Sequence, residues 1–126
     1  MMPRISLPHY LRRPYVVETT DRDGSRVICA ESWWLQKISS KHQEMKGQYA
    51  AAVATIQQPD AIYQSSTHAN RKVLYKRGIL PAPHHELYVR VVIEYHEIVI
   101  KGFPPATLVT AFSCPSIKKG ETQLWP

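Results

Sequence analysis

The sequence ELYVRVVIEYHEIVIKGFPPATLVTAF, residues 86–112, decides the fold. Its first part alternates between a wholly apolar face (Leu87, Val89, Val91, Ile93, Tyr95) and a face that carries charge (Tyr88, Arg90, Val92, Glu94, His96). This period of two predicts a half-buried strand. The prolines at 104 and 105 lack N–H donors and interrupt the ladder, and the β-branched and apolar residues 107–112 predict a second strand. We therefore expect a long antiparallel hairpin at the centre of a sheet.

Polar side chains lie on the charged face of this predicted hairpin. We expect Arg90, Glu94 and His96 to project from one face of the first strand, while Thr110 stands on the neighbouring strand. Polar groups that gather on one exposed surface are candidates for binding and catalysis. This set is where we expect chemistry.

Length and composition bound the class of protein. A chain of 126 residues predicts one domain, and shares of 44% hydrophobic and 21% charged residues do not indicate intrinsic disorder. No apolar run approaches the roughly 20 residues that span a bilayer. Residues 1–11 hold charges and two prolines instead of the continuous apolar region of a secretory signal. We expect a cytoplasmic protein with no membrane partner.

The charge balance points to anionic partners. The chain has 16 Lys and Arg against 10 Asp and Glu, a net charge of +6, and a pI near 9.5, so RNA is an expected partner because phosphates attract Lys and Arg.

Cys29 and Cys114 make neither a zinc site nor a disulfide framework and are expected to be buried free thiols. The six histidines lack a zinc spacing such as His-Glu-x-x-His, so we expect no metal and no cofactor.

The order of the remaining segments predicts the fold class. Residues 1–14 are expected to form an irregular basic arm and residues 15–126 a single domain. The runs 15–19 and 26–30 flank Asp21-Arg-Asp-Gly24 and predict a hairpin, and an apolar period of about 3.6 predicts two helices within residues 31–56. Residues 61–65 and 72–77 predict further strands, and residues 114–126 an extended tail tied down in part by Trp125. We expect an α+β fold with the N-terminal hairpin and the helices packed on one side of a roughly four-stranded antiparallel sheet.

The sequence KISSKHQE, residues 37–44, gathers ionisable groups beside an apolar helix face. Imidazole titrates near neutral pH, so His42 is a candidate general acid or base, and Glu44 is a candidate orienting group or second base. Lys37 and Lys41 are candidate substrate-binding residues. The alternative interpretation is a boundary histidine at a helix junction with solvated Lys and Glu neighbours.

A second basic cluster lies on the predicted strand near residues 71–77. Alternation sends Arg71 and Tyr75 to one face and Lys76 to the other, so no single face collects every charge. Because a guanidinium offers a bidentate fork, Arg71 is a candidate phosphate clamp if it faces the same cleft as His42 and Thr110. Lys76 and Tyr75 are further substrate-binding candidates, and solvated edge-strand lysines are the alternative.

Taken together, these segments resemble the small phage-associated domains of the barnase, EndoU, colicin and RelE ribonuclease-like superfamily. The similarity covers roughly residues 33–125. It rests on the order and spacing of KISSKHQE, a helix ending in Gln58-Pro-Asp60, strands at 71–75 and 87–93, the run LVTAF at 108–112, Lys118-Lys-Gly and Leu124-Trp125. In similar members the helix motif begins with His-Ile and continues through a basic residue to His-Pro-Glu. Here Lys37 stands in place of the first histidine and Gln43 in place of the proline.

The resemblance implies metal-independent RNA cleavage in which the 2′-hydroxyl attacks the adjacent phosphate. Such a reaction needs a base, an acid for the leaving oxygen and positive charge on the phosphorane. The implied roles are His42 as acid or base, Glu44 as its orienting group or second base, Arg71 and Lys76 as phosphate stabilisers, and Thr110 as a hydrogen-bond donor. A toxin or mobile-element effector of this kind implies an antitoxin or immunity protein as a further partner.

Two alternatives stay open. Lys37 is a poor proton-transfer group unless its pKa is depressed, so the first alternative is a domain that binds RNA or protein without cleaving it. The second is a structural or inhibitory protein with Trp33, Tyr63 or Trp125 in a protein interface. The sequence leaves the RNA target and the oligomeric state open.

Overall fold

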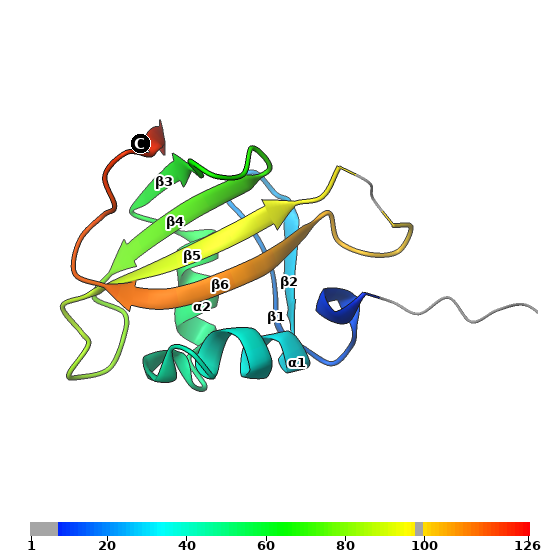
Figure 1. Cartoon of the computed structure of the whole chain (residues 1–126), viewed down its shortest axis with the longest axis horizontal. Helices are drawn as coiled ribbons and strands as arrows, with labels where there is room; N and C mark the ends of the chain where they lie inside the picture. Colours follow the sequence, from blue (N-terminus) through cyan, green and yellow to red (C-terminus); the bar gives the residue numbers. More distant parts are fainter. Residues whose placement is uncertain (1–7, 98–99) are drawn as a thin grey trace, which may run out of the picture.

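A computed structural model of the chain describes residues 8–97 and 100–126. Within these residues, seven strands form one mixed sheet in the order β1-β2-β6-β5-β4-β3-β7 (Figure 1). The strands are β1 (Tyr15–Thr20), β2 (Arg26–Ala30), β3 (Ala61–Gln64), β4 (Arg71–Arg77), β5 (Tyr88–Tyr95), β6 (Ala106–Cys114) and β7 (Thr122–Trp125). The helical elements are η1 (His9–Leu11), α1 (Glu31–Trp33), the π-helix η2 (Trp34–Ser39), η3 (Gln43–Met45) and α2 (Tyr49–Gln57).

The central hairpin is confirmed. Strands β5 and β6 pair antiparallel from Tyr88 opposite Cys114 to Tyr95 opposite Ala106. Val89, Val91 and Ile93 are fully buried, as the alternating pattern predicts. Of the interruption between the strands, residues 98–99 lie outside the described part of the chain.

The predicted N-terminal hairpin is also confirmed, because β1 pairs antiparallel with β2. The Asp21 carboxylate accepts hydrogen bonds from the backbone N–H groups of Asp23 (3.0 Å) and Ser25 (2.9 Å). Gly24 has a φ of +86°, a conformation that costs glycine little and other residues more. The Asp-Gly turn therefore fixes the connection between the two strands.

The prediction of a roughly four-stranded antiparallel sheet with helices packed on one side is wrong. Val27 and Ile28 of β2 pair in parallel with Ala106 and Thr107 of β6, which joins the N-terminal hairpin to the main sheet. The predicted extended tail adds β7, which pairs antiparallel with β3. The described helices are short, so the architecture is mostly sheet. Alternation identifies a strand but not its partner, because pairing between distant segments leaves no local pattern.

The main core lies between the sheet and the helical segments. Trp34, Ile38, Met45 and Ile56 are fully buried in one cluster that also contains the inward side chains of β5. Figure 1 shows α2 behind the sheet and α1 along its lower edge, beneath β6. The helical pattern breaks after residue 39, because the Lys41 and His42 N–H groups both donate to the Ile38 carbonyl and the chain then turns into η3.

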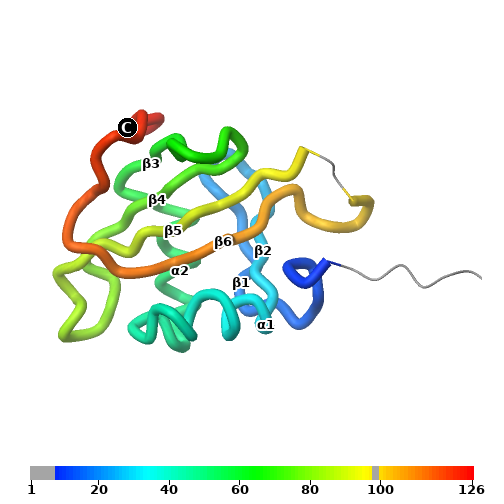
Figure 2. Tube along the Cα trace, viewed as in Figure 1, coloured from blue at the N-terminus to red at the C-terminus, as the bar shows by residue number. Residues whose placement is uncertain are grey.

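Both ends of the described chain pack against the rest of the domain. Leu11 of η1 is buried, so part of the predicted irregular arm packs on the domain; residues 1–7 lie outside the described part. At the other end the Arg22 guanidinium lies 3.9 Å from the centre of the Trp125 ring, which contacts the main core. Figure 2 shows the chain after β6 rising past β4 to end beside β3.

In the part of the chain that the structure describes, no helix is both long and apolar enough to span a bilayer.

Candidate functional site

A second, smaller apolar cluster lies on the sheet face opposite the main core, here called the open face. Its buried members are Val73, Tyr75 and Val92. Their neighbours along the strands, Leu74 and Val91, belong to the main core, as expected when successive side chains point to opposite faces. The open face is therefore apolar at its centre, and polar side chains can lie around this apolar surface.

The open face carries a hollow of about 230 Å³, here called the sheet hollow. Its walls come from the β3–β4 loop, strands β4, β5 and β6, and the segment before β7. The lining residues are Ser65, Ser66, Thr67, Arg71, Val73, Arg90, Val92, Val109, Thr110, Lys118 and Glu121. Of the predicted site residues, Arg71 and Thr110 thus share one cavity.

A β-bulge in β6 turns Thr110 into the sheet hollow. Val92 lies opposite Thr110 and Ile93 opposite Leu108, so Val109 is an extra residue without a partner in the β5 register. Leu108 is in the main core, yet both Val109 and Thr110 line the hollow. Regular alternation would send Thr110 to the same face as Leu108. Bulges re-aim side chains in this way and are frequent beside functional sites.

Arg71 and Arg90 bring positive charge to the hollow. The Arg71 Nε lies 3.0 Å from a Glu94 carboxylate oxygen. The Arg90 Nε donates to the Tyr75 hydroxyl at 3.1 Å, and its Nη2 lies 3.4 Å from the Glu121 carboxylate. Since the Tyr75 side chain is fully buried, the Arg90 guanidinium is held by a fixed partner. Tyr75, which was predicted to bind substrate, is here a buried residue that supports Arg90.

Glu121 lines the sheet hollow and was not predicted as a site residue. Its side chain is 2% exposed, and it accepts a hydrogen bond from the Ser66 N–H at 3.2 Å in addition to its contact with Arg90. The residue lies in a polar tail without periodic pattern, so no local signal points to the sheet. Three long-range contacts bring this tail over the open face: Ile117 packs on the apolar cluster, the Lys118 N–H donates to the Tyr75 hydroxyl, and β7 pairs with β3.

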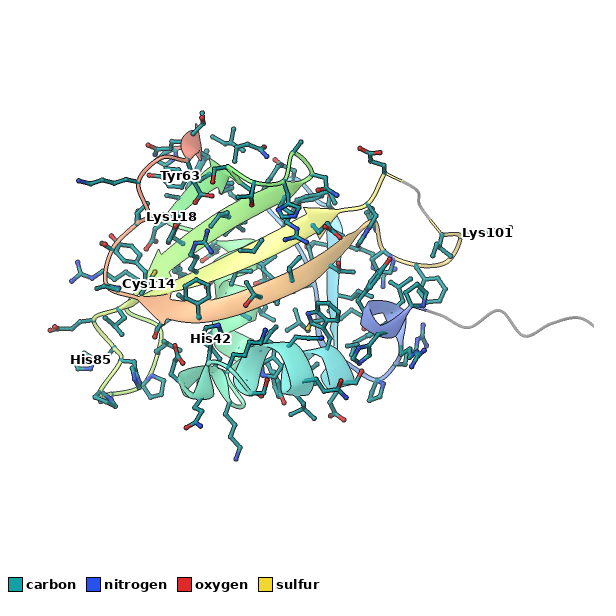
Figure 3. The ribbon with its side chains drawn as sticks, viewed as in Figure 1. His42, Tyr63, His85, Lys101, Cys114 and Lys118 are labelled. Atoms are coloured by element: carbon teal, nitrogen blue, oxygen red, sulfur yellow. The ribbon has the colours of Figure 1, made fainter. Side chains whose placement is uncertain are left out.

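His42 lies beside the hollow but is not part of its lining. Its ring stacks on Phe112 with a centroid distance of 4.9 Å. Phe112 is opposite Arg90 in the β5–β6 register, and the Arg90 guanidinium lies 5.3 Å from the Phe112 ring centre. Figure 3 shows His42 below β6 and Lys118 beside β4. The imidazole is thus next to the open face, with one aromatic ring between it and Arg90.

Glu44 binds the edge of β6 instead of pointing into the hollow. One carboxylate oxygen accepts hydrogen bonds from the N–H (2.9 Å) and the hydroxyl (2.5 Å) of Ser113. Burial raises the pKa of Glu44, but the Ser113 hydrogen bonds and the nearby charge of His42 outweigh it, so the net pKa is lowered. A carboxylate engaged in this way is a weak candidate for a second base.

Lysines predicted to bind substrate lie elsewhere. Lys37 and Lys41 are exposed, and the Lys37 amine lies 5.9 Å from the centre of the Trp33 ring. The Lys76 amine donates to the Gln58 carbonyl at 2.7 Å. None of the three lines the sheet hollow, whereas Lys118 does.

The polar set predicted on β5 divides between two places. Arg90 lines the hollow, and Glu94 pairs with Arg71 at its margin. His96 lies beyond it, where its Nε2 is 2.8 Å from the Thr107 hydroxyl and its ring stacks on Tyr10 at 5.1 Å. His96 therefore contacts the N-terminal segment and does not reach the hollow.

The donors around the hollow suit an anion. In the described part of the chain, no group of three or more His, Cys, Asp or Glu side chains is placed to hold a metal ion. Guanidinium, hydroxyl and backbone N–H groups over a partly apolar floor are the groups that bind phosphate esters.

The chain matches no protein-family model, no curated protein and no solved structure.

Proposed function

We propose that this protein is a metal-independent endoribonuclease-like domain that acts on RNA in the cytoplasm, as its resemblance to the barnase, EndoU, colicin and RelE superfamily implies. One observation carries the proposal: His42 stacks on Phe112, and the Phe112 ring in turn lies 5.3 Å from the Arg90 guanidinium of a hollow that also holds Arg71, Thr110 and Lys118. An imidazole at the margin of a cationic hollow combines proton transfer with phosphate binding.

The proposed reaction balances without a metal or cofactor. The RNA 2′-oxygen forms a bond to phosphorus while the bond from phosphorus to the 5′-oxygen breaks. A base takes the proton of the 2′-hydroxyl, and an acid gives a proton to the leaving 5′-oxygen. The products are a 2′,3′-cyclic phosphate end and a 5′-hydroxyl end.

The chain's own residues take separate roles in this proposal. His42 is the acid or the base, and solvent water exchanges the other proton. Arg90 and Arg71 neutralise the charge that develops on the non-bridging phosphate oxygens, and Thr110 donates a hydrogen bond to one of them. Tyr75 keeps the Arg90 guanidinium in place. Glu44 positions the β6 edge through Ser113.

Incubation of end-labelled RNA with the purified protein tests the proposal. We expect fragments with cyclic phosphate ends, formed equally well with and without a chelator, and loss of most cleavage in Arg90→Gln. Intact RNA after prolonged incubation with folded wild-type protein would contradict the proposal.

A second candidate function is RNA binding without cleavage. The position of Lys37 favours this function. Lys37 stands where the helix motif of the similar ribonuclease-like domains has its first histidine, and it is exposed near Trp33, outside the hollow. Salt-sensitive binding of RNA with no product would support this candidate. If RNA cleavage occurs and slows the growth of the host, we expect an antitoxin or immunity protein that binds this domain and inhibits cleavage.

A further inference from the structure

The buried carboxylate of Glu121 occupies the cationic end of the sheet hollow. One oxygen accepts from the Ser66 backbone N–H at 3.2 Å, and the other lies 3.4 Å from the Arg90 Nη2. The side chains of Glu121 and Arg90 are 2% and 14% exposed. A backbone N–H and a guanidinium are the same pair of donors that bind the oxygens of a phosphate group.

The contacts of Glu121 are longer than an optimal ion pair. Charge-assisted N–H···O bonds are commonly about 2.7–2.9 Å, and both contacts of Glu121 exceed that range. Arg90 has a second partner in the Tyr75 hydroxyl, so its position does not depend on Glu121 alone. A phosphate group can therefore replace the carboxylate without removing the support of the guanidinium.

The segment that delivers Glu121 is anchored on either side of this residue. Ile117 packs on the apolar cluster of the open face, and the Lys118 N–H donates to the Tyr75 hydroxyl at 3.2 Å. Residues 118–120 and Thr122, Gln123 and Leu124 are exposed, and Leu124 is 48% exposed. The β7–β3 pairing carries a register shift, and Trp125 supplies the contact with the main core. Between these anchors the residues on both sides of Glu121 are exposed, so its side chain can leave the hollow while the anchors stay in place.

We propose that Glu121 is an intramolecular occupant of a phosphate subsite made by the Ser66 N–H and the Arg90 guanidinium, and that a phosphodiester ligand displaces it on binding. The tail before β7 then competes with the ligand and lowers its apparent affinity. The proposal rests on the proposed function only in taking the sheet hollow as the nucleic-acid site; it does not require cleavage.

The test compares the binding of inorganic phosphate and of a 2′-deoxy-oligonucleotide to wild type and Glu121→Gln. The amide keeps the shape of the side chain but removes the competing charge. We expect both probes to bind about three- to tenfold more tightly to Glu121→Gln. Glu86→Gln is the matched control, because Glu86 is exposed, lies outside the hollow and changes the net charge equally. We expect a smaller effect from that control.

Unchanged or weaker binding in Glu121→Gln overturns the proposal, and weaker binding would instead assign Glu121 the task of holding Arg90 in place. An equal gain in Glu86→Gln also overturns it, since the effect would then be one of net charge. The gain must disappear in an Arg90→Gln background, because both effects belong to one subsite.

A second measurement uses the wild-type chain and does not depend on a variant that folds. The carboxylate carbon resonance of Glu121 should shift as inorganic phosphate is added, with the same midpoint as binding. A resonance that stays fixed through saturation contradicts displacement. The deoxy probe lacks a 2′-hydroxyl and cannot be cleaved by the proposed reaction, so the binding test does not depend on cleavage. Failure of wild type to cut RNA would contradict the nuclease proposal but would not affect the binding result for Glu121.

Discussion

The indole N–H of Trp33 donates a hydrogen bond of 3.0 Å to the carbonyl of Val109, the extra residue of the bulge in β6. Trp33 comes from α1, so the helical segment holds the strand at the point where its side-chain alternation changes. Glu44 binds the N–H of Ser113 further along the same edge. Side chains therefore satisfy two backbone groups on the part of the β6 edge that β2 leaves unpaired, and the bulge that turns Thr110 into the sheet hollow is supported by Trp33.

Replacement of Trp33 by phenylalanine tests the support of the bulge. The phenylalanine ring fills most of the space of the indole, but the Val109 carbonyl loses its hydrogen-bond donor. This loss should lower the free energy of unfolding by about 1 kcal/mol. Urea denaturation of wild type and Trp33→Phe measures this difference. Equal midpoints and slopes would show that the Val109 carbonyl finds another partner at no cost.

Glu44 makes stability depend on pH in a defined direction. Its pKa in the folded protein is lowered, so its contribution is complete above the unfolded-state value of about 4.3 and is lost as pH falls through the lower folded value. At neutral pH, the free energy of unfolding of Glu44→Gln should be about 1 kcal/mol lower than that of wild type. The difference is small because Glu44 is partly exposed and salt screens its charge.

Unfolding free energies of both proteins between pH 3 and 7 check this prediction. The difference between wild type and Glu44→Gln should shrink toward the acid end, because a protonated carboxyl resembles the amide. A difference that stays constant over this range would mean that the Ser113 contact does not depend on the charge of Glu44.

Phe112 positions His42 through ring stacking. In Phe112→Leu the apolar contact with the β5–β6 surface is kept, but the imidazole loses its flat support. If the nuclease proposal holds, RNA cleavage should fall about tenfold while the affinity for a 2′-deoxy-oligonucleotide changes little. Equal loss of binding and cleavage would instead indicate that Phe112 itself contacts the nucleic acid.

The two cysteines should differ in reactivity. Burial raises the pKa of Cys29 to about 12, so its thiol stays protonated and shielded near neutral pH. Cys114 is only partly buried, and burial raises its pKa less while the Arg90 charge opposes the increase. Alkylation at pH 8 should modify Cys114 slowly in the folded protein and both thiols after denaturation. Rapid labelling of Cys29 before unfolding contradicts the packing described above.

The strands that the sequence predicts are those with local patterns. Alternation at Val89 and Val91 identifies β5, and Asp-Gly at 23–24 identifies the turn between β1 and β2. The parallel pairing of Val27 with Ala106 was not predicted, because it joins segments that share no turn. For the same reason β7 was expected only as an extended tail. These two pairings turn the expected four-stranded sheet into a mixed and larger one.

Local patterns indicate candidate residue types for the site, but they do not indicate which of these residues share a cavity. Arg71 and Thr110 share the sheet hollow, although Thr110 does so through a bulge that alternation does not foresee. Glu44 has the right chemistry for a base, but Ser113, distant in sequence, binds it. Glu121 was missed because its place on the open face depends on long-range contacts of the tail with Tyr75 and with β3. Local spacing thus identifies reactive groups, while long-range pairing decides which of them meet.

The most direct test of the central claim is the rate of RNA cleavage by His42→Ala, compared with wild type and with His85→Ala, which alters an exposed loop histidine. Loss of general acid or base catalysis should slow cleavage by about 10²–10⁴-fold in His42→Ala and leave His85→Ala at the wild-type rate. Binding of a 2′-deoxy-oligonucleotide should be nearly equal in all three proteins. Cleavage by His42→Ala at the wild-type rate, or no cleavage by any of the three, would contradict the account.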